Sequence, residues 1–247
     1  MGFGCVHQRT GDLSIVYLLS LMKPIASNIL PIAVVMLMPA CALMAQGSLT
    51  YLSYLDSRTG GAQSVASDSW LGEGFRTGTN ISVLYRLDSV ELLMGNAIGN
   101  PDGFSVSLYS GDQFFPVEKI ADLDGPTSPA SAGVYEYTAS SVILSPATLY
   151  YLVVAAAVPS AIGSYRWQHV DPTDFERVSI DQWGVSTPSS FSADGQAWSR
   201  GGHIFQFAVN ATVIPEPSSL ALVGLAGICL AGRGLKRRVS ASSVQSP

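Results

Sequence analysis

The sequence predicts an all-β fold, an antiparallel β-sandwich of the jelly-roll type, flanked by an N-terminal signal peptide helix and a C-terminal transmembrane helix. Short segments with apolar residues at every second position recur along the chain, which is the pattern of half-buried strands. Glycine, proline, serine and asparagine separate these segments, and no segment repeats apolar residues at helical spacing. We therefore expect about eight to ten strands in two packed sheets, in an order that one sequence leaves open.

The start of the chain, residues 1–45, has the parts of a secretory signal peptide. Lys23 supplies the positive charge, an apolar stretch follows it, and small residues come next. Ala42 completes an Ala-Cys-Ala sequence that suits a signal peptidase, and cleavage after Ala45 is the alternative. The residues before Met22 add nothing that a signal peptide needs, so we expect translation to start at Met22.

The three cysteines lie outside the part of the chain that we expect to fold as a domain, residues 46–212. Cys5 and Cys41 belong to the leader, and Cys229 belongs to the apolar tail. Cys41 also ends a Met-Pro-Ala-Cys sequence that resembles a bacterial lipoprotein box. An exported domain without cysteines must be held by its apolar core, and this domain is large enough for that. A cysteine-ligated metal site and a cysteine nucleophile are excluded from it.

The predicted domain is acidic. Residues 46–217 contain seven basic and seventeen acidic side chains, a net charge of −10, whereas the whole chain has −5. Such a surface repels nucleic acid and anionic lipid, so we expect no nucleic-acid partner. Solubility is the simplest explanation of this charge, and binding of cations or basic partners is the alternative.

The first part of the domain contains a turn-rich segment and then a long strand. Residues 46–80 are rich in Ser, Gly, Thr and Asp, and we expect turns around Trp70 and Phe75 there. In residues 81–94 the apolar positions alternate and then resume one position out of phase. A shift of one residue moves the apolar side chains to the other face, so we expect a bulge or bend near residues 88–89.

Five later segments are also predicted as strands. Residues 103–111 alternate as a half-buried strand, and residues 134–144 form either a strand pair or one bent strand. Residues 145–158 are the most apolar stretch of the domain, rich in β-branched and aromatic side chains, and we expect a central strand. Alternation returns in residues 164–170 and in residues 203–213.

The histidines and tryptophans of the domain are its most distinctive side chains. His169 and His203 lie on alternating strands, so we expect core or edge histidines and no metal site. Trp167 also lies on such a strand and should pack in the core. Trp183 and Trp198 lie in polar stretches rich in Gly and Ser, where exposed rings could stack on sugars.

No motif of a known chemistry occurs in the chain. The sequence lacks the nucleophile elbow, the zinc-protease motif, the P-loop and the dinucleotide fingerprint, so we expect no enzyme, no catalytic residues and no cofactor. Carboxylates that could bind Ca²⁺ lack the EF-hand spacing, and we expect solvated acidic loops. A glycosidase pair is the alternative. These carboxylates are Asp122, Asp124, Asp171, Asp174 and Glu176.

Residues 218–232 form a short apolar stretch near the end of the chain. Fifteen helical residues span roughly 22 Å, which is less than the hydrocarbon core of about 30 Å. A bilayer can adapt to such a short span at modest cost. The basic cluster behind the stretch should stay cytoplasmic, leaving the domain outside and residues 239–247 as a cytoplasmic tail. The cluster consists of Arg233, Lys236, Arg237 and Arg238. An ordinary permanent anchor is the alternative.

Residues 213–238 resemble a PEP-CTERM sorting signal, a tripartite module of exported proteins from Gram-negative bacteria. The parts are the triplet, the apolar run 220–231 and the basic cluster, although nine residues follow the arginines where such tails usually stop. The triplet consists of Pro215, Glu216 and Pro217. Its prolines disfavour a helix, so a peptidase would meet extended chain. The resemblance implies processing near the triplet by a membrane-integral exosortase, and an association with biofilm and extracellular polymer.

The predicted domain is similar to the choice-of-anchor R type of exported domain. The resembling stretches include "SWLGEGFRTG", "YRLDSVELLMGNA", "GFSVSLYS", "YTASSVILSPATLYYLVV" and "FQFAVNAT", and they cover most of residues 65–212. This resemblance implies an architecture and export, and it brings no activity.

These patterns lead to one functional hypothesis and two alternatives. We expect an exported protein that is transiently anchored in the inner membrane, N-terminus out and C-terminus in, and then reaches the cell surface or extracellular matrix. Its role would be structural or adhesive, with exosortase and exopolysaccharide as partners. A carbohydrate-binding module for exopolysaccharide is the first alternative. An extracellular polysaccharide hydrolase is the second.

Overall fold

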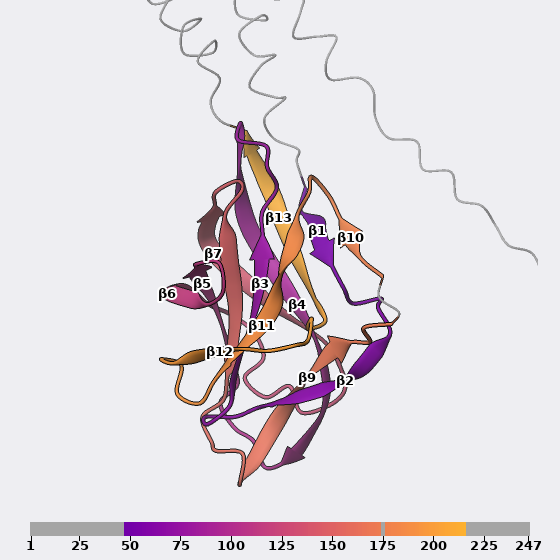
Figure 1. The fold of residues 1–247 in the computed structure, drawn as a ribbon, viewed down its shortest axis with the longest axis vertical. Coiled ribbons are helices and arrows are strands. Elements are labelled where there is room, and N and C mark those ends of the chain that lie inside the picture. The colour runs from indigo at the N-terminus through magenta and orange to yellow at the C-terminus, as the bar shows by residue number, and fades with distance from the viewer. Residues whose placement is uncertain (1–46, 174–175, 216–247) are drawn as a thin grey trace, which may run out of the picture. The chain divides into compact units, whose positions relative to one another are not determined.

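Antiparallel strands make up the fold, and none of the residues that the structure describes is in a helix (Figure 1). The structure is a computed structural model, and it describes residues 47–173 and 176–215. No helix in these residues could cross a membrane. The all-β prediction is therefore confirmed for them. The predicted signal peptide, residues 1–45, and the predicted membrane span, residues 218–232, lie outside the described residues.

The strands pair into two sheets. The larger one contains β1 (Leu49–Ser53), β2 (Thr59–Val65), β4 (Val83–Gly99), β7 (Gly133–Leu144), β9 (Gly163–Val170), β10 (Val178–Ser179) and β13 (Phe207–Pro215). The other contains β3 (Trp70–Arg76), β5 (Ser105–Gly111), β6 (Pro116–Leu123), β8 (Leu149–Ala155), β11 (Gly184–Ser192) and β12 (Trp198–Arg200). Their orders are β10-β1-β13-β4-β9-β2, with β7 also paired to β4, and β12-β11-β3-β8-β5-β6.

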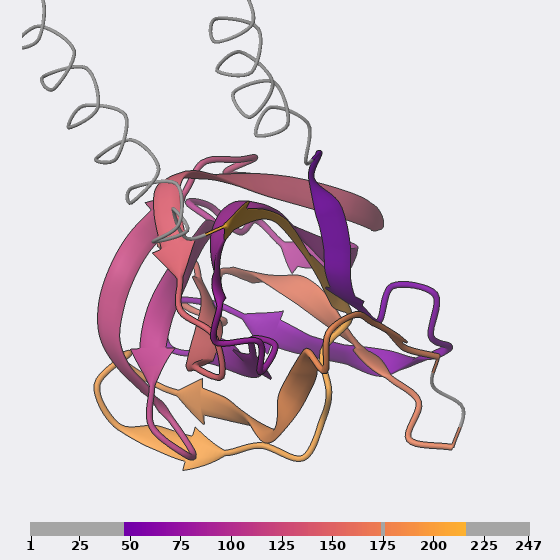
Figure 2. The same ribbon diagram turned by 90° about the horizontal axis from the view of Figure 1, so that it is seen from above.

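The eight strands from β2 to β9 switch from one sheet to the other at every connection except the hairpin between β5 and β6. One sheet contains the series β2-β9-β4-β7 and the other the series β3-β8-β5-β6. This is the pairing order of an eight-stranded jelly roll. The other five strands extend the two sheets, so the described residues hold thirteen strands, more than we expected. Seen from above, the strands curve around a common interior (Figure 2).

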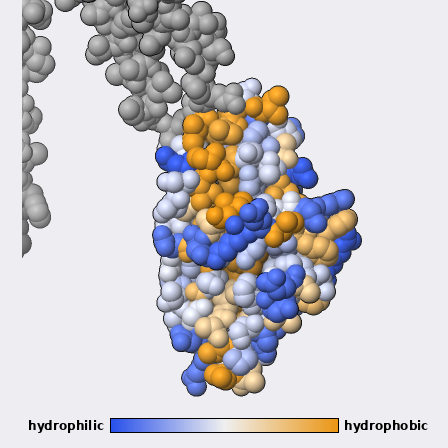
Figure 3. Space-filling view, turned by 90° about the vertical axis from the view of Figure 1, so that its left-hand side faces the viewer, coloured by the Kyte–Doolittle hydropathy of each residue, from blue (hydrophilic) through white to orange (hydrophobic). Residues whose placement is uncertain are grey.

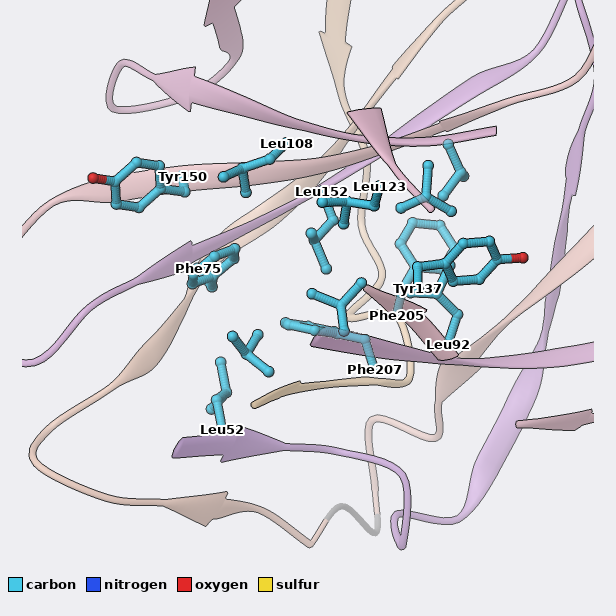
Figure 4. Close-up of a cluster of buried hydrophobic side chains, with 14 of the residues drawn as sticks. Leu52, Phe75, Leu92, Leu108, Leu123, Tyr137, Tyr150, Leu152, Phe205 and Phe207 are labelled. Atoms are coloured by element: carbon cyan, nitrogen blue, oxygen red, sulfur yellow. The ribbon is translucent and has the colours of Figure 1, made fainter. Parts of the chain in front are cut away.

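The inner faces of the two sheets share one hydrophobic core. Phe75 comes from one sheet and Phe207 from the other, and their ring centroids lie 6.4 Å apart. Leu92 and Leu152 join this core from β4 and β8 (Figure 4). Apolar burial on this scale is the main stabilising contribution to a domain that holds no cysteine.

Strand β8 is buried on both of its faces. Tyr150 and Leu152 point into the shared core, whereas Tyr151 and Val153 belong to a second apolar cluster on the other face. Side chains that pack against this second cluster include Trp70 and Trp198. A strand that is buried on both faces carries apolar side chains at successive positions, which explains the unbroken apolar run in the sequence. The prediction of a central strand is confirmed.

The predicted bulge in the long strand is also confirmed. The register of β4 against β7 shifts between Leu87 and Ser89, and its register against β13 shifts at the same place. Leu87 and Val90 are consequently both fully buried. Strand β7 is one bent strand, and within its irregular part Ser141 has a φ of 60°. The left-handed backbone of that residue suits a turn out of the regular ladder.

The expectation of turns around Trp70 and Phe75, in the polar segment 46–80, is wrong. This segment forms β1, β2 and β3, and Trp70 and Phe75 lie within β3. The inward positions of β3 include Glu73, a carboxyl that is fully buried. A charged residue at an inward position, between glycines, hides the apolar alternation on which the prediction of strands depends.

The alternation at the end of the domain is confirmed at its apolar positions, but Gln206 and Ala208 on the opposite positions are buried too. Phe207 and Val209 are fully buried as expected, but Gln206, expected to face outward, is fully buried as well. The Gln206 amide donates to the carbonyl oxygen of Ser57 at 2.6 Å, and Oε1 accepts a hydrogen bond from Thr59 at 2.8 Å. The loop between β1 and β2 covers this side chain, and its polar groups therefore have partners inside the protein.

Candidate functional site

A cleft of about 410 Å³ opens between residues of the two sheets. Small-molecule sites in proteins typically measure a few hundred Å³. Its polar lining residues are Gln63, Ser69, Ser189, Ser190, Arg200 and His203, with Gly201 and Gly202 between the last two. Its apolar lining residues are Leu71, Phe191 and Phe205. None of these residues is acidic, so the cleft offers hydrogen bonds and one permanent positive charge.

Phe191 is the exposed aromatic side chain of the cleft. It lies on β11 opposite Leu71 of β3, and it is 48% exposed. Arg200 lies on the neighbouring β12, with its guanidinium 3.6 Å from the centre of the Phe114 ring. Contact with the ring holds this cation in place beside the cleft. An exposed aromatic ring can stack on a sugar ring, and the polar groups around it can bind the sugar hydroxyls.

The two histidines of the domain stack on each other at the cleft. Their ring centroids are 4.0 Å apart, and the rings are inclined by 24°. His169 is buried, and His203 is half-buried in the cleft wall. Burial, with a smaller contribution from His169, lowers the pKa of His203, so this ring is neutral at pH 7. Among the described residues, no group of three metal-ligating side chains occurs.

Glu73 is a buried carboxyl that the sequence did not single out. Its Oε2 accepts a hydrogen bond of 2.8 Å from the backbone N–H of Phe205, a residue of the cleft. Its Oε1 has no hydrogen-bond partner. Burial raises the pKa of Glu73 well above its ordinary value, so the group is held as a neutral acid behind the cleft.

The tryptophans predicted to be exposed are placed differently by the structure. Trp183 is 1% exposed, with its ring centroid 5.0 Å from that of Tyr51 and 6.0 Å from that of Phe75. The expectation that Trp183 is exposed is therefore wrong, because the loop that carries it folds into the core. Trp198 is half-buried against the second apolar cluster, on the outer face of β8. Trp167 is fully buried as expected.

The described residues of the acidic loops do not line the cleft, and two of them form ion pairs with nearby basic side chains. Asp122 forms an ion pair with Lys119 and accepts a hydrogen bond from Ser107, and these contacts lower its pKa. Asp171 forms an ion pair with Arg58. Asp124 bridges to Thr138 through the backbone, and Glu176 is exposed. Asp174 lies outside the described residues.

The last strand leads directly into the proline-flanked triplet. Strand β13 pairs with β4 up to its final residue, with Val213 opposite Tyr85 and Pro215 opposite Val83. Its pairing with β1 reaches only to Ala211. Pro215 is thus both the last residue of the strand and the first residue of the triplet. Glu216, Pro217 and the basic cluster of residues 233–238 lie outside the described residues.

The fold and this strand end define an all-β domain whose last strand runs directly into the C-terminal segment. Residues 213–238 match the PEP-CTERM protein-sorting motif. The match supports an exported protein that exosortase sorts and processes, with a C-terminal membrane anchor before processing. A comparison with curated proteins found no matching relative.

Proposed function

We propose that the protein is delivered by its C-terminal signal to the cell surface or extracellular matrix, where the domain has a structural or adhesive role in exopolysaccharide. The match of residues 213–238 to the sorting motif carries this proposal. The resemblance of that motif to signals of biofilm-associated proteins points to the destination. The resemblance of the domain to the choice-of-anchor R type agrees with it.

Two properties of the domain support a role outside the cell, and a third, the lining of the cleft, argues against a hydrolase. A core without cysteines keeps its stability whatever the redox conditions, and an acidic surface keeps the domain soluble. The lining residues of the cleft include no carboxylate, whereas glycoside hydrolysis generally needs a pair of them. A polysaccharide hydrolase is therefore the weaker alternative.

The sorting step can be tested by changing the triplet. We expect Glu216→Ala combined with Pro217→Ala to leave the C-terminal apolar run on the chain and to retain the protein in the membrane fraction. Glu176→Ala is the matched control, because Glu176 is an exposed glutamate of the domain. Membrane fractionation and intact-mass analysis measure both effects. Normal release of the triplet variant, with the same mass change as the control, would contradict the proposal.

A carbohydrate-binding module is the second candidate, and the cleft favours it. Phe191 would stack on a sugar ring, while Gln63, Arg200 and His203 would bind hydroxyl or carboxylate groups. We expect binding on a glycan array and a roughly tenfold weaker affinity for Phe191→Ala, a loss of about 1.4 kcal/mol. Val134→Ala, at another exposed apolar residue, should bind like the wild type. Absence of binding with and without Ca²⁺ would refute this candidate.

A further inference from the structure

One end of the domain exposes several apolar side chains, and β13 ends there. Ile81, Leu49 and Ile143 are 77%, 54% and 45% exposed, respectively. Leu84 and Ile214 lie opposite each other in the pairing of β4 with β13, and both are half-buried. We call these five residues the strand-end face. Hydrophobic residues gather towards this end of the molecule (Figure 3).

Exposure alone does not select this end as a docking surface. Ile98 and Ile162 are each 54% exposed near the other end of β4, where Gly99 pairs with Gly163. The two ends differ in where the chain continues. The C-terminal anchor follows β13 and therefore leaves from the strand-end face.

The length of chain that follows β13 limits how far this end can lie from the membrane. Pro215 ends the strand, and the apolar run 220–231 begins five residues later. Five extended residues reach at most about 18 Å. The headgroup layer on each side of a bilayer takes up roughly 5–8 Å of that distance. Before processing, the strand-end face is therefore held within roughly 10–13 Å of the headgroups.

The charges beside the strand-end face allow close contact with lipid. Arg86 forms an ion pair with Asp88. Arg76 donates to the carbonyl oxygen of Ala147, and Asp181 lies in the turn whose backbone approaches Gly78. These two positive and two negative side chains balance, although the domain as a whole is acidic. Headgroups would thus meet an apolar end of the domain on which these four charges cancel, with Glu216 of the triplet adding one negative charge beside it.

We propose that, before processing, the strand-end face docks on the bilayer surface, with Ile81 and Leu49 inserted among the lipid headgroups. The proposal rests on the membrane anchor of the proposed function. Docking orients the domain so that the triplet lies at the membrane surface, where a membrane-integral peptidase can reach it. Removal of the anchor leaves only the weak contacts of a few side chains, so the processed domain can leave the membrane.

The test uses the full chain in phosphatidylcholine vesicles, with its three cysteines replaced by serine. A fluorophore is attached to Asn80→Cys, beside Ile81, or to Ala161→Cys, beside Ile162 at the other end of the domain. We expect a quencher on the lipid headgroups to quench the label at residue 80 at least threefold more than the label at residue 161. Ile81→Ser with Leu49→Ser should reduce that difference. Equal quenching at the two positions would overturn the proposal.

A longer tether separates docking from simple proximity. We expect the difference between the two labels to persist after insertion of about twenty Gly and Ser residues behind Pro217. Loss of the difference in that variant would show that the tether alone holds the domain there, and would refute docking. A difference that appears only with exosortase present would assign the face to a protein partner, and would also refute it.

The anchor itself is checked in a separate variant that keeps Cys229, which lies in the apolar run, as its labelled cysteine and has only Cys5 and Cys41 replaced by serine. Quenching of this label by a quencher in the acyl chains confirms insertion. A Cys229 label that is not quenched would refute the anchor, and the docking proposal with it. Quenching at Cys229 together with equal quenching at residues 80 and 161 would refute docking alone.

Discussion

Glu73 shows how a single buried side chain can make the stability of this domain depend on pH. Its carboxyl has one hydrogen bond, from the N–H of Phe205, and no compensating cation is among the causes of its pKa shift. Ionisation would therefore place an unpaired charge in the core. The group remains protonated in the fold, although an unfolded chain releases that proton near its ordinary pKa of 4.5.

The sign of the pH dependence follows from this raised pKa. Below pH 4.5 both states hold the proton, and the stabilising effect of the low pH is complete. As pH rises from there towards the raised pKa of the folded state, only the unfolded state releases the proton, so the free energy of unfolding falls. Each pKa unit of the shift corresponds to about 1.4 kcal/mol.

We predict that Glu73→Gln makes the free energy of unfolding less dependent on pH as the pH rises above 4.5. Glutamine stays neutral, and its amide oxygen can still accept the hydrogen bond from Phe205. Urea unfolding at several pH values measures the effect, with Glu136→Gln as the control at an exposed glutamate. The same pH slope in the wild type and in Glu73→Gln would contradict this account of Glu73.

At the scale of elements, strands with a clear apolar period could be predicted from the sequence. The bulge in β4, the bend in β7 and the central position of β8 all follow from where apolar residues fall. Strands β2 and β3 could not be predicted, because glycines, a serine and Glu73 occupy many of their positions and their burial depends on distant segments. Strand β1 is a stretch of only five residues. The β-propensity of a residue is a weak predictor of strands where tertiary contacts determine burial.

The candidate site likewise has one part that could be predicted from the sequence and one part that could not. The sorting signal is contiguous, and its triplet, apolar run and basic residues can be read in order. The cleft brings together two distant stretches of the chain, residues 63–71 and residues 189–205. Only the fold places them together. Phe191 lies in an alternating segment rich in serine, which could have marked it as part of a strand. Nothing in the sequence, however, distinguishes an exposed Phe191 from a core residue.

The bulge of β4 leads to a prediction about the whole strand. Asp88 is the extra residue, because Leu87 and Ser89 on either side of it pair with the consecutive residues Ala211 and Asn210 of β13. Its deletion would place Val90, Leu92 and Met94 in regular alternation with Leu87, so these side chains would stay on the inward face and keep a burial of about 1.5–3 kcal/mol each. We expect the variant to be folded by circular dichroism and proteolysis, like the deletion of Ser131 in the loop between β6 and β7. An unfolded Asp88 deletion would refute this account of the bulge.

At the scale of the whole molecule, the last strand joins the fold to the sorting signal. Residues 213–215 are paired with β4 and also begin the matched motif. Cleavage beyond Pro217 would therefore leave every strand of the domain in place. The domain can keep its fold and its cleft after the anchor is gone, which is what a protein of the cell surface or matrix requires.

The central claim is that exosortase removes the C-terminal anchor and so releases the domain to its destination. The most direct measurement is the intact mass of the protein in two strains of its producer, with and without exosortase. We predict that the strain with exosortase yields an extracellular form that lacks residues 218–247, and that the other strain retains the full C-terminus in its membrane fraction. An extracellular form that still carries residues 232–238, or the same processed mass in both strains, would contradict the account.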